Sequence, residues 1–118
     1  MSNNDMGIRK GDLWRSRLNG EGSVYHGAGI VVAVSSDVFN ITSTNLTVVV
    51  LLKRNPTQET HVLIQANRET GLHVDSTAMA ETITTVSKGM LIHRIGYIND
   101  ELMAEVDKSI LKHLGIKE

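Results

Sequence analysis

The sequence contains no cysteine. Disulfide bonds, thiolate catalysis and cysteine-bound zinc are therefore excluded, and the absence agrees with a reducing, cytoplasmic environment. Aromatic residues make up only 3% of the 118 residues, so the stacking platforms that commonly bind single-stranded nucleic acid are nearly missing. The one proline, Pro56, falls between two expected strands, where it interrupts neither.

Long apolar runs are also missing. No segment reaches about 18 consecutive apolar residues, so we expect a soluble, cytoplasmic protein that does not enter a membrane. The net charge is −1, from 12 basic and 13 acidic residues, which argues against a basic field over the whole molecule and leaves local basic patches open. The five histidines form no pair at i, i+4, and no metal site or other cofactor is expected.

The length fits one domain. Residues 1–7 are polar and are predicted to be a disordered arm, and residues 8–118 to form the single domain. Two apolar, mostly β-branched runs, Ile30–Val34 and Thr47–Leu52, are typical of strands buried on both faces. Residues 35–37 are a helix-start or turn signal. Further strands are predicted at residues 8–18, 61–64, 81–86 and 91–96.

Near the end of the chain the apolar residues recur at the spacing of a helix. Asn99 or Asp100 suits the N-cap of this helix, and Gly115 suits its end. Met103 and Leu111 are expected to lie at the edge of a dimer interface. With several strands before one amphipathic helix, the pattern predicts a mainly β, α+β fold: a small barrel or bent sheet with the helix laid on it. The apolar stripe consists of Leu102, Val106, Ile110 and Leu114.

Four segments, in order, resemble the MazF/PemK/Kid toxin family. Residues 8–14 read Ile-Arg-Lys-Gly-Asp-Leu-Trp, similar to the family's opening I-x-x-G-D-[I/L/V]-W. Residues 94–98 and the helix after them resemble its closing R-[I/L]-G-x-[L/I] and helix. Residues 71–75 and 80–83 stand where the family has G-L-x-V-D and A-E-Q-I. The resemblance covers roughly Ile8 to Leu114 and implies a small SH3-like or CcdB-like barrel.

The resemblance also implies a function. The family consists of small cytoplasmic toxins, often homodimers, each paired with an antitoxin. They usually cleave single-stranded RNA without a metal ion: the sugar 2′-hydroxyl attacks the adjacent phosphate, helped by an arginine and a threonine. Here the family's arginine-proline place holds Gly29-Ile30, and its threonine place holds Lys53 or Arg54, depending on a shift of one residue. Both of the family's site residues are thus replaced.

The residues that remain suggest a site for RNA cleavage. Lys53 and Arg54 are the predicted cations for the phosphate, and His26 is the predicted base near neutral pH. In the family's barrel the Gly22–Gly29 loop approaches the end of the strand at residues 47–52, with Glu81 on a neighbouring strand. The predicted binding residues are Tyr25, which would stack on a base, and Gly27, Ala28, Gly29, Ile30 and Glu81.

Two other interpretations stay open. Lys53 and Arg54 can be the solvated end of a strand, with Tyr25 and His26 on a loop surface. Alternatively, the protein binds a partner without catalysis, because Gly29-Ile30 is less cationic and more apolar than arginine-proline. The partner would be an antitoxin-like peptide or a host protein such as gyrase, the target of CcdB. The gyrase analogy is limited, because Leu114-Gly115-Ile116 lacks the aromatic residue of the CcdB C-terminus.

Overall fold

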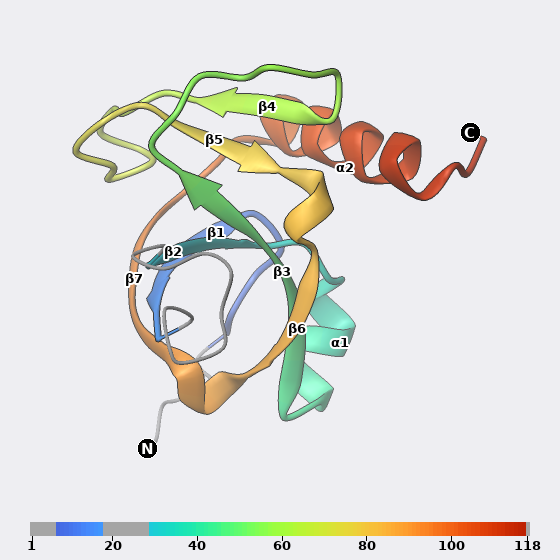
Figure 1. The fold of residues 1–118 in the computed structure, drawn as a ribbon. Helices are drawn as coiled ribbons and strands as arrows, with labels where there is room; N and C mark the ends of the chain where they lie inside the picture. The colour runs from blue at the N-terminus through green and yellow to red at the C-terminus, as the bar shows by residue number, and fades with distance from the viewer. Residues whose placement is uncertain (1–6, 18–28, 118) are drawn as a thin grey trace.

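A computed structural model describes residues 7–17 and 29–117 (Figure 1). None of the described helices has the length and apolar character that crossing a membrane requires. The described residues form, in chain order, β1 (Asp12–Ser16), β2 (Ile30–Ala33), α1 (Asp37–Thr42), β3 (Asn45–Leu52), β4 (His61–Ile64), β5 (Ser76–Met79), the short 3-10 helix η1 (Ala80–Thr82), β6 (Thr84–Ser87), the 3-10 helix η2 (Lys88–Met90), β7 (Leu91–Tyr97) and α2 (Asp100–Leu114).

The strands join in one antiparallel sheet that bends into a barrel. The sheet order is β4-β5-β3-β2-β1-β7, and β6 pairs with the first half of β3. The end of β3 pairs instead with β5, so the edge of β3 divides between two partners. Because η2 carries the chain from β6 to β7, the strands β1, β2, β3, β6 and β7 enclose a ring (Figure 1). The predicted mainly β barrel is confirmed.

Two apolar clusters lie on opposite faces of the central strands. Val31, Val48 and Val50 point into the barrel. Val32 and Val49, which alternate with them, belong to a second cluster outside the barrel, between the sheet and α2. All five side chains are at most 1% exposed, so the two long β-branched runs are buried on both faces, as their composition predicts.

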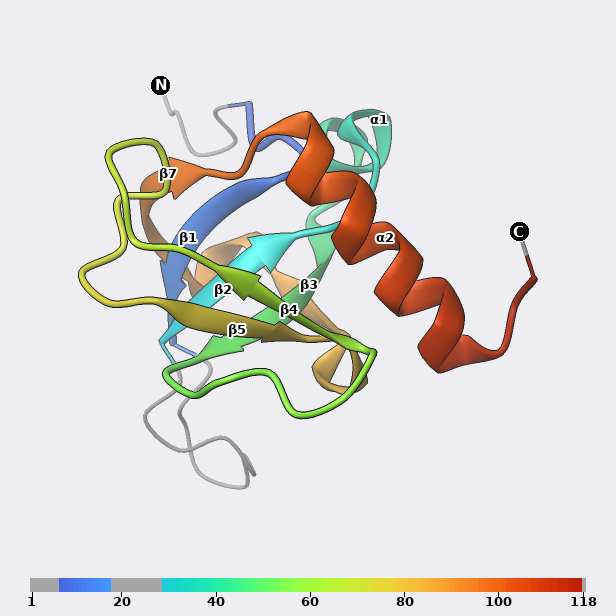
Figure 2. The ribbon, with the colours of Figure 1, turned by 90° about the horizontal axis from the view of Figure 1, so that it is seen from above.

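Helix α2 has the expected ends, and its inner face is broader than the expected stripe: Val106 is buried, Leu102 and Ile110 pack partly buried against the outer cluster, and Met103 and Ser109 are buried beside them. The side chain of Asn99 accepts a hydrogen bond from the backbone N–H of Leu102 (2.9 Å), and Gly115 ends the helix with φ 73°. Met103 and Val106 are buried in the outer cluster, so the prediction that Met103 edges an interface is wrong. The buried positions are spaced by three residues, and the last turn extends beyond β4, leaving Leu114 half exposed (Figure 2).

Other differences from the sequence-based expectations have local causes. The first strand begins at Asp12 rather than residue 8, because residues 9–12 turn through Gly11, whose φ is 94°. The strand expected at residues 81–86 begins at Thr84, because η1 precedes it. The helix-start signal at residues 35–37 does open a helix, α1, with Ser36 as its N-cap. Strand β5 has no counterpart among the predictions.

Two glycines let the segment after β4 pack against β7. Gly71 has φ 69°, and a Cβ there would lie 1.9 Å from the carbonyl oxygen of Ile95. A Cβ on Gly96 would lie 2.3 Å from the carbonyl oxygen of Thr70. The backbone N–H of Tyr97 also donates to the carbonyl oxygen of Glu69 (2.9 Å). This close backbone contact joins residues 69–71 to the barrel.

We predict that Gly71→Ala lowers the free energy of unfolding by at least about 2 kcal/mol, because the left-handed backbone and the clash with Ile95 both act against the new side chain. Gly115→Ala is the matched control: its φ is 73° and no heavy atom lies within 4 Å of the added Cβ. That variant should lose only about 1 kcal/mol. Urea denaturation measures both. Equal losses would contradict the steric argument.

Candidate functional site

The register of the sheet brings three chain segments together at one end of the barrel. Arg15 is the pairing partner of Ile30, and Ile30 is the partner of Leu51. The end of β1, the start of β2 and the end of β3 therefore lie side by side (Figure 2). We call this region the basic end. It comprises Arg15, Gly29, Ile30, Lys53 and Arg54.

Lys53 and Arg54 follow β3 directly, and both are exposed. Their backbone is held in a tight turn: the N–H of Arg54 donates to the carbonyl oxygen of Leu52 (2.9 Å), and the hydroxyl of Thr77 donates to the carbonyl oxygen of Arg54. Neither charged side chain forms a hydrogen bond or ion pair with a described residue. Their charges are thus available to an anionic ligand, on a backbone that is fixed.

Gly29, just before β2, and Ile30, the first residue of that strand, lie beside these cations. The carbonyl oxygen of Gly29 accepts a hydrogen bond from the backbone N–H of Ser16 (2.6 Å), and Ile30 is partly buried against the outer cluster. The guanidinium of Arg15 lies close to Gly29. If residue 29 carried a Cβ, that atom would lie 3.2 Å from Nη1 of Arg15. Arg15 was not among the predicted site residues. Only the pairing of β1 with β2 could have identified it.

The remaining predicted residues do not gather at the basic end. Tyr25, His26, Gly27 and Ala28 lie outside the described residues, so the roles proposed for them remain predictions. Glu81 lies in η1, not on a strand, and η1 follows the end of β5 that is distant from Lys53.

Glu81 is instead paired with a histidine that is buried beneath it. His61 Nε2 lies 2.8 Å from Glu81 Oε2, and the His61 side chain is 2% exposed. The backbone N–H of Thr57 donates to His61 Nδ1 (3.1 Å), so Nε2 is the nitrogen that carries the proton to Glu81. Both ring nitrogens are engaged, which gives His61 a structural role.

The charge state of Glu81 follows from these contacts. Burial raises the pKa of the Glu81 carboxyl, but the hydrogen bond from His61, a backbone hydrogen bond and the electrostatic effect of the nearby His61 and His113 together outweigh it. The pKa of Glu81 therefore lies below its ordinary value of 4.5. Its second oxygen, Oε1, is buried without a hydrogen-bond partner among the described residues. Within that part of the chain, no three side chains are grouped to hold a metal ion.

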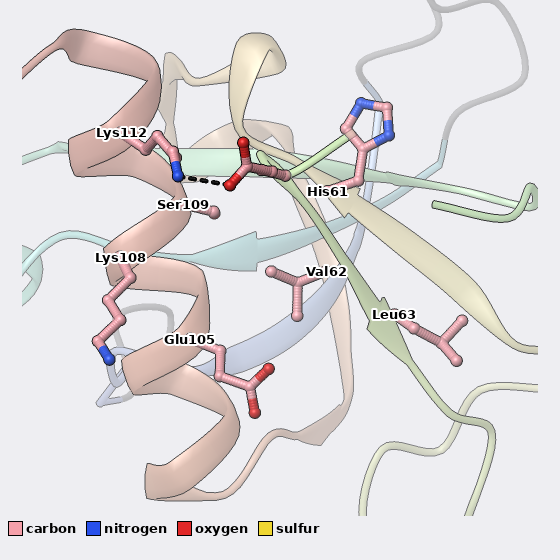
Figure 3. Close-up of a pocket in the computed structure, with 8 residues that line it drawn as sticks. His61, Val62, Leu63, Glu105, Lys108, Ser109 and Lys112 are labelled. Atoms are coloured by element: carbon pink, nitrogen blue, oxygen red, sulfur yellow. Dashed lines mark hydrogen bonds and ion pairs between the residues drawn. The ribbon is translucent and has the colours of Figure 1, made fainter. Parts of the chain in front are cut away.

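Next to His61 lies a hollow of about 380 Å³ between β4 and α2 (Figure 3). Both acidic and basic side chains line it. Lys112 Nζ lies 2.6 Å from Glu59 Oε1, and this pair crosses from the helix to the segment before β4. Leu63 supplies an exposed apolar wall. With both signs of charge present, this hollow lacks the concentrated positive charge of the basic end.

A smaller hollow, of about 270 Å³, lies near the start of β1. Arg94 Nε lies 3.2 Å from the buried Asp12 Oδ1, and the Arg94 guanidinium stands 5.7 Å from the centre of the Tyr97 ring. Asp12 also accepts a hydrogen bond from the backbone N–H of Arg9 (2.9 Å). Asp12 and Arg94 belong to the first and the last of the four segments that carry the family resemblance. Here their charges neutralise each other, and Asp12 stabilises the turn before β1.

Comparison with known proteins identifies the family. The family model described as PemK-like, MazF-like toxin of type II toxin-antitoxin system matches residues 9–114. The chain belongs to this toxin family. Its sequence is 29% identical over 115 residues to the endoribonuclease MazF9 of Mycobacterium tuberculosis, covering 92% of this chain and 98% of that relative.

Solved structures of MazF-like toxins share the fold. A mycobacterial endoribonuclease matches with TM-score 0.78 and 19% identity over 95% of both chains. The Mycobacterium tuberculosis toxin MazF-mt6 matches with TM-score 0.77 and 18% identity, over 91% of this chain and 99% of that one. A mycobacterial endoribonuclease in complex with its cognate antitoxin matches with TM-score 0.74 and 18% identity, over 96% and 98%.

The Glu81–His61 pair gives a pH-dependent prediction. Because the folded-state pKa of Glu81 is lowered, its contribution to stability is present above pH 4.5 and is lost as the pH falls through the folded-state pKa. Glu81→Gln should therefore be less stable than the wild type in urea at pH 7, and the difference should shrink below pH 4.5. Glu59→Gln, which removes a fully exposed carboxylate, is the control and should show little difference. A constant gap at all pH values would contradict the assignment.

Proposed function

We propose that this chain is an endoribonuclease toxin that cleaves single-stranded RNA without a metal ion, and that the basic end receives the RNA backbone. The observation that carries the proposal is the gathering of Arg15, Lys53 and Arg54 around Gly29 in a chain of net charge −1. Membership of the toxin family and the endoribonuclease MazF9 as a relative support it.

The chemistry requires few groups. The 2′-hydroxyl of the RNA attacks the adjacent phosphorus, a bond forms between them, and the bond from phosphorus to the 5′-oxygen of the next nucleotide breaks. The products are a 2′,3′-cyclic phosphate and a 5′-hydroxyl, whose oxygen takes up a proton from water. Fixed cations stabilise the negative charge that develops on the phosphate oxygens. The exposed cations Lys53 and Arg54, one of which holds the family's threonine place, are suited to this. His26 is the proposed acceptor of the hydroxyl proton.

The direct test is incubation of purified protein with a long single-stranded RNA in EDTA. Discrete fragments support a metal-independent nuclease. Intact RNA at high protein concentration would overturn this function and favour a binding role.

Three single substitutions test the proposed residues. Lys53→Ala, Arg54→Ala and His26→Ala should each lower the cleavage rate about 100-fold, because each removes a cation or a base from the reaction. For Lys53→Ala and Arg54→Ala we expect a nearly unchanged melting temperature, since both side chains are exposed. If growth inhibition survives all three changes combined, these residues do not carry the activity.

We propose an antitoxin as the protein partner. Two relatives of this fold were solved with one: the mycobacterial endoribonuclease with its cognate antitoxin, and MazE-MazF of Deinococcus radiodurans, which matches with TM-score 0.68 and 14% identity over 92% and 95% of the two chains. The product of a small acidic reading frame upstream of the gene is the candidate to test. It should bind the toxin and suppress RNA cleavage.

Binding without cleavage is the second candidate. It is favoured by Gly29 and Ile30, which place no charge where the family has arginine and leave a partly exposed apolar side chain. In that case an antitoxin-like peptide or a host protein would occupy the basic end. Ala28 and Ile30 would then be the positions to substitute, and RNA would stay intact.

We also propose that the chain forms a homodimer. Exposed apolar side chains on α1 and at the end of α2, including Val38, Ile41 and Leu114, are available for self-association. Sedimentation equilibrium at micromolar concentration should give twice the chain mass of 12.9 kDa. A mass of one chain would exclude the dimer at that concentration.

A further inference from the structure

Arg15 is an exposed arginine whose guanidinium is held near the backbone of another strand. Its Nη1 lies 3.2 Å from the place where a Cβ on Gly29 would be, a contact tighter than ordinary van der Waals distance. Glycine at position 29 therefore leaves the room that the guanidinium occupies. Among the described residues, the Arg15 side chain has no hydrogen-bond or ion-pair partner. Its donors are free to bind a ligand.

The residue next to Arg15 on the same face is a histidine. In the pairing of β1 with β7, Arg15 is directly opposite His93. Directly opposed residues of antiparallel strands point to the same face, with Cβ atoms roughly 4.5–5.5 Å apart. His93 is exposed, and the next residue, Arg94, turns to the other face, where it pairs with Asp12. The sheet register thus sets His93, Arg15 and Ile30 in one row.

This row continues the positive charge of Lys53 and Arg54 across the sheet. Ile30 pairs with Leu51 on β3, and Lys53 follows Leu51 by two residues. No acidic side chain belongs to the row. A guanidinium presents paired N–H donors that match two oxygens of one phosphate, and an imidazole N–H can donate to the same group.

We propose that Arg15 binds the scissile phosphate of the RNA and that His93 donates a hydrogen bond to the same phosphate. The proposal rests on the endoribonuclease function and names the residues that supply the cation missing from position 29. Arg15 reaches that position from the neighbouring strand, so the charge is present although the sequence position holds glycine. His93 positions the phosphate through this hydrogen bond.

The test compares cleavage rates of purified variants on one RNA in EDTA. Arg15→Ala should lower the rate about 100-fold, and Arg15→Lys, a point charge without the paired donors, should retain part of it. His93→Ala should lower the rate about 10-fold, and His93→Gln, which keeps an N–H donor, should retain most of it. Arg17→Ala is the matched control: it removes the same charge two residues away, where the guanidinium donates to the Gly89 carbonyl oxygen (3.4 Å).

A double variant tests the position of the charge directly. In Arg15→Ala with Gly29→Arg the space over position 29 is vacated, and the backbone there is not in the left-handed region. The new guanidinium should recover at least about 10-fold of the lost rate. Melting curves should be unchanged for Arg15→Ala, because the side chain is exposed and unpaired among the described residues.

The outcomes separate this inference from the function on which it rests. If the wild type cleaves RNA and Arg15→Ala cleaves equally well, the role of Arg15 is overturned and the nuclease function stands. If Arg17→Ala loses as much rate as Arg15→Ala, the effect is one of net charge and the specific contact is overturned. An inactive wild type overturns both proposals.

Discussion

The burial of β3 on both faces is the constraint on which the rest of the structure depends. Val48 and Val50 fill the barrel, and Val49 and Leu51 lie in the outer cluster near α2. A slip of one residue in the pairing of β3 would exchange these two sets and place every side chain on the wrong face. The same strand pairs with β2 on one edge and with β5 and β6 on the other. Its register therefore also determines that Gly29 lies next to the residues that follow β3.

Much of the fold is predictable from the sequence because two central strands and the C-terminal helix have strong local patterns. The two β-branched runs and the capped helix α2 have unambiguous patterns. Strand β5 has none: its residues, Ser76–Met79, are buried at every position, and the first three of them are small or polar, so they show no alternation. Helix α1 has six residues and exposes Val38 and Ile41, so it has no apolar stripe. Its only signal is the N-cap Ser36, and that signal is correct.

The candidate site is less predictable, because pairing between strands assembles it. Lys53 and Arg54 can be found, since they are charged residues directly after an apolar strand. Arg15 cannot: it is 14 residues before Gly29 in the chain and reaches it only through the register of β1 with β2. The partner of Glu81 is hidden for the same reason, since His61 lies 20 residues away on β4. The apolar pattern of the sequence predicts the barrel. Which polar side chains come into contact depends on the pairing of strands that are distant in the sequence.

Binding of RNA at the basic end can be tested by mapping the surface of the protein that the RNA contacts. A single-stranded RNA with 2′-O-methyl groups lacks the attacking hydroxyl and stays intact. It can be titrated into isotopically labelled protein while backbone amide signals are followed by NMR. The largest shifts are expected at Arg15, Gly29, Lys53 and Arg54. Unchanged signals there, with shifts at the residues that line the hollow between β4 and α2, would show that RNA binds elsewhere.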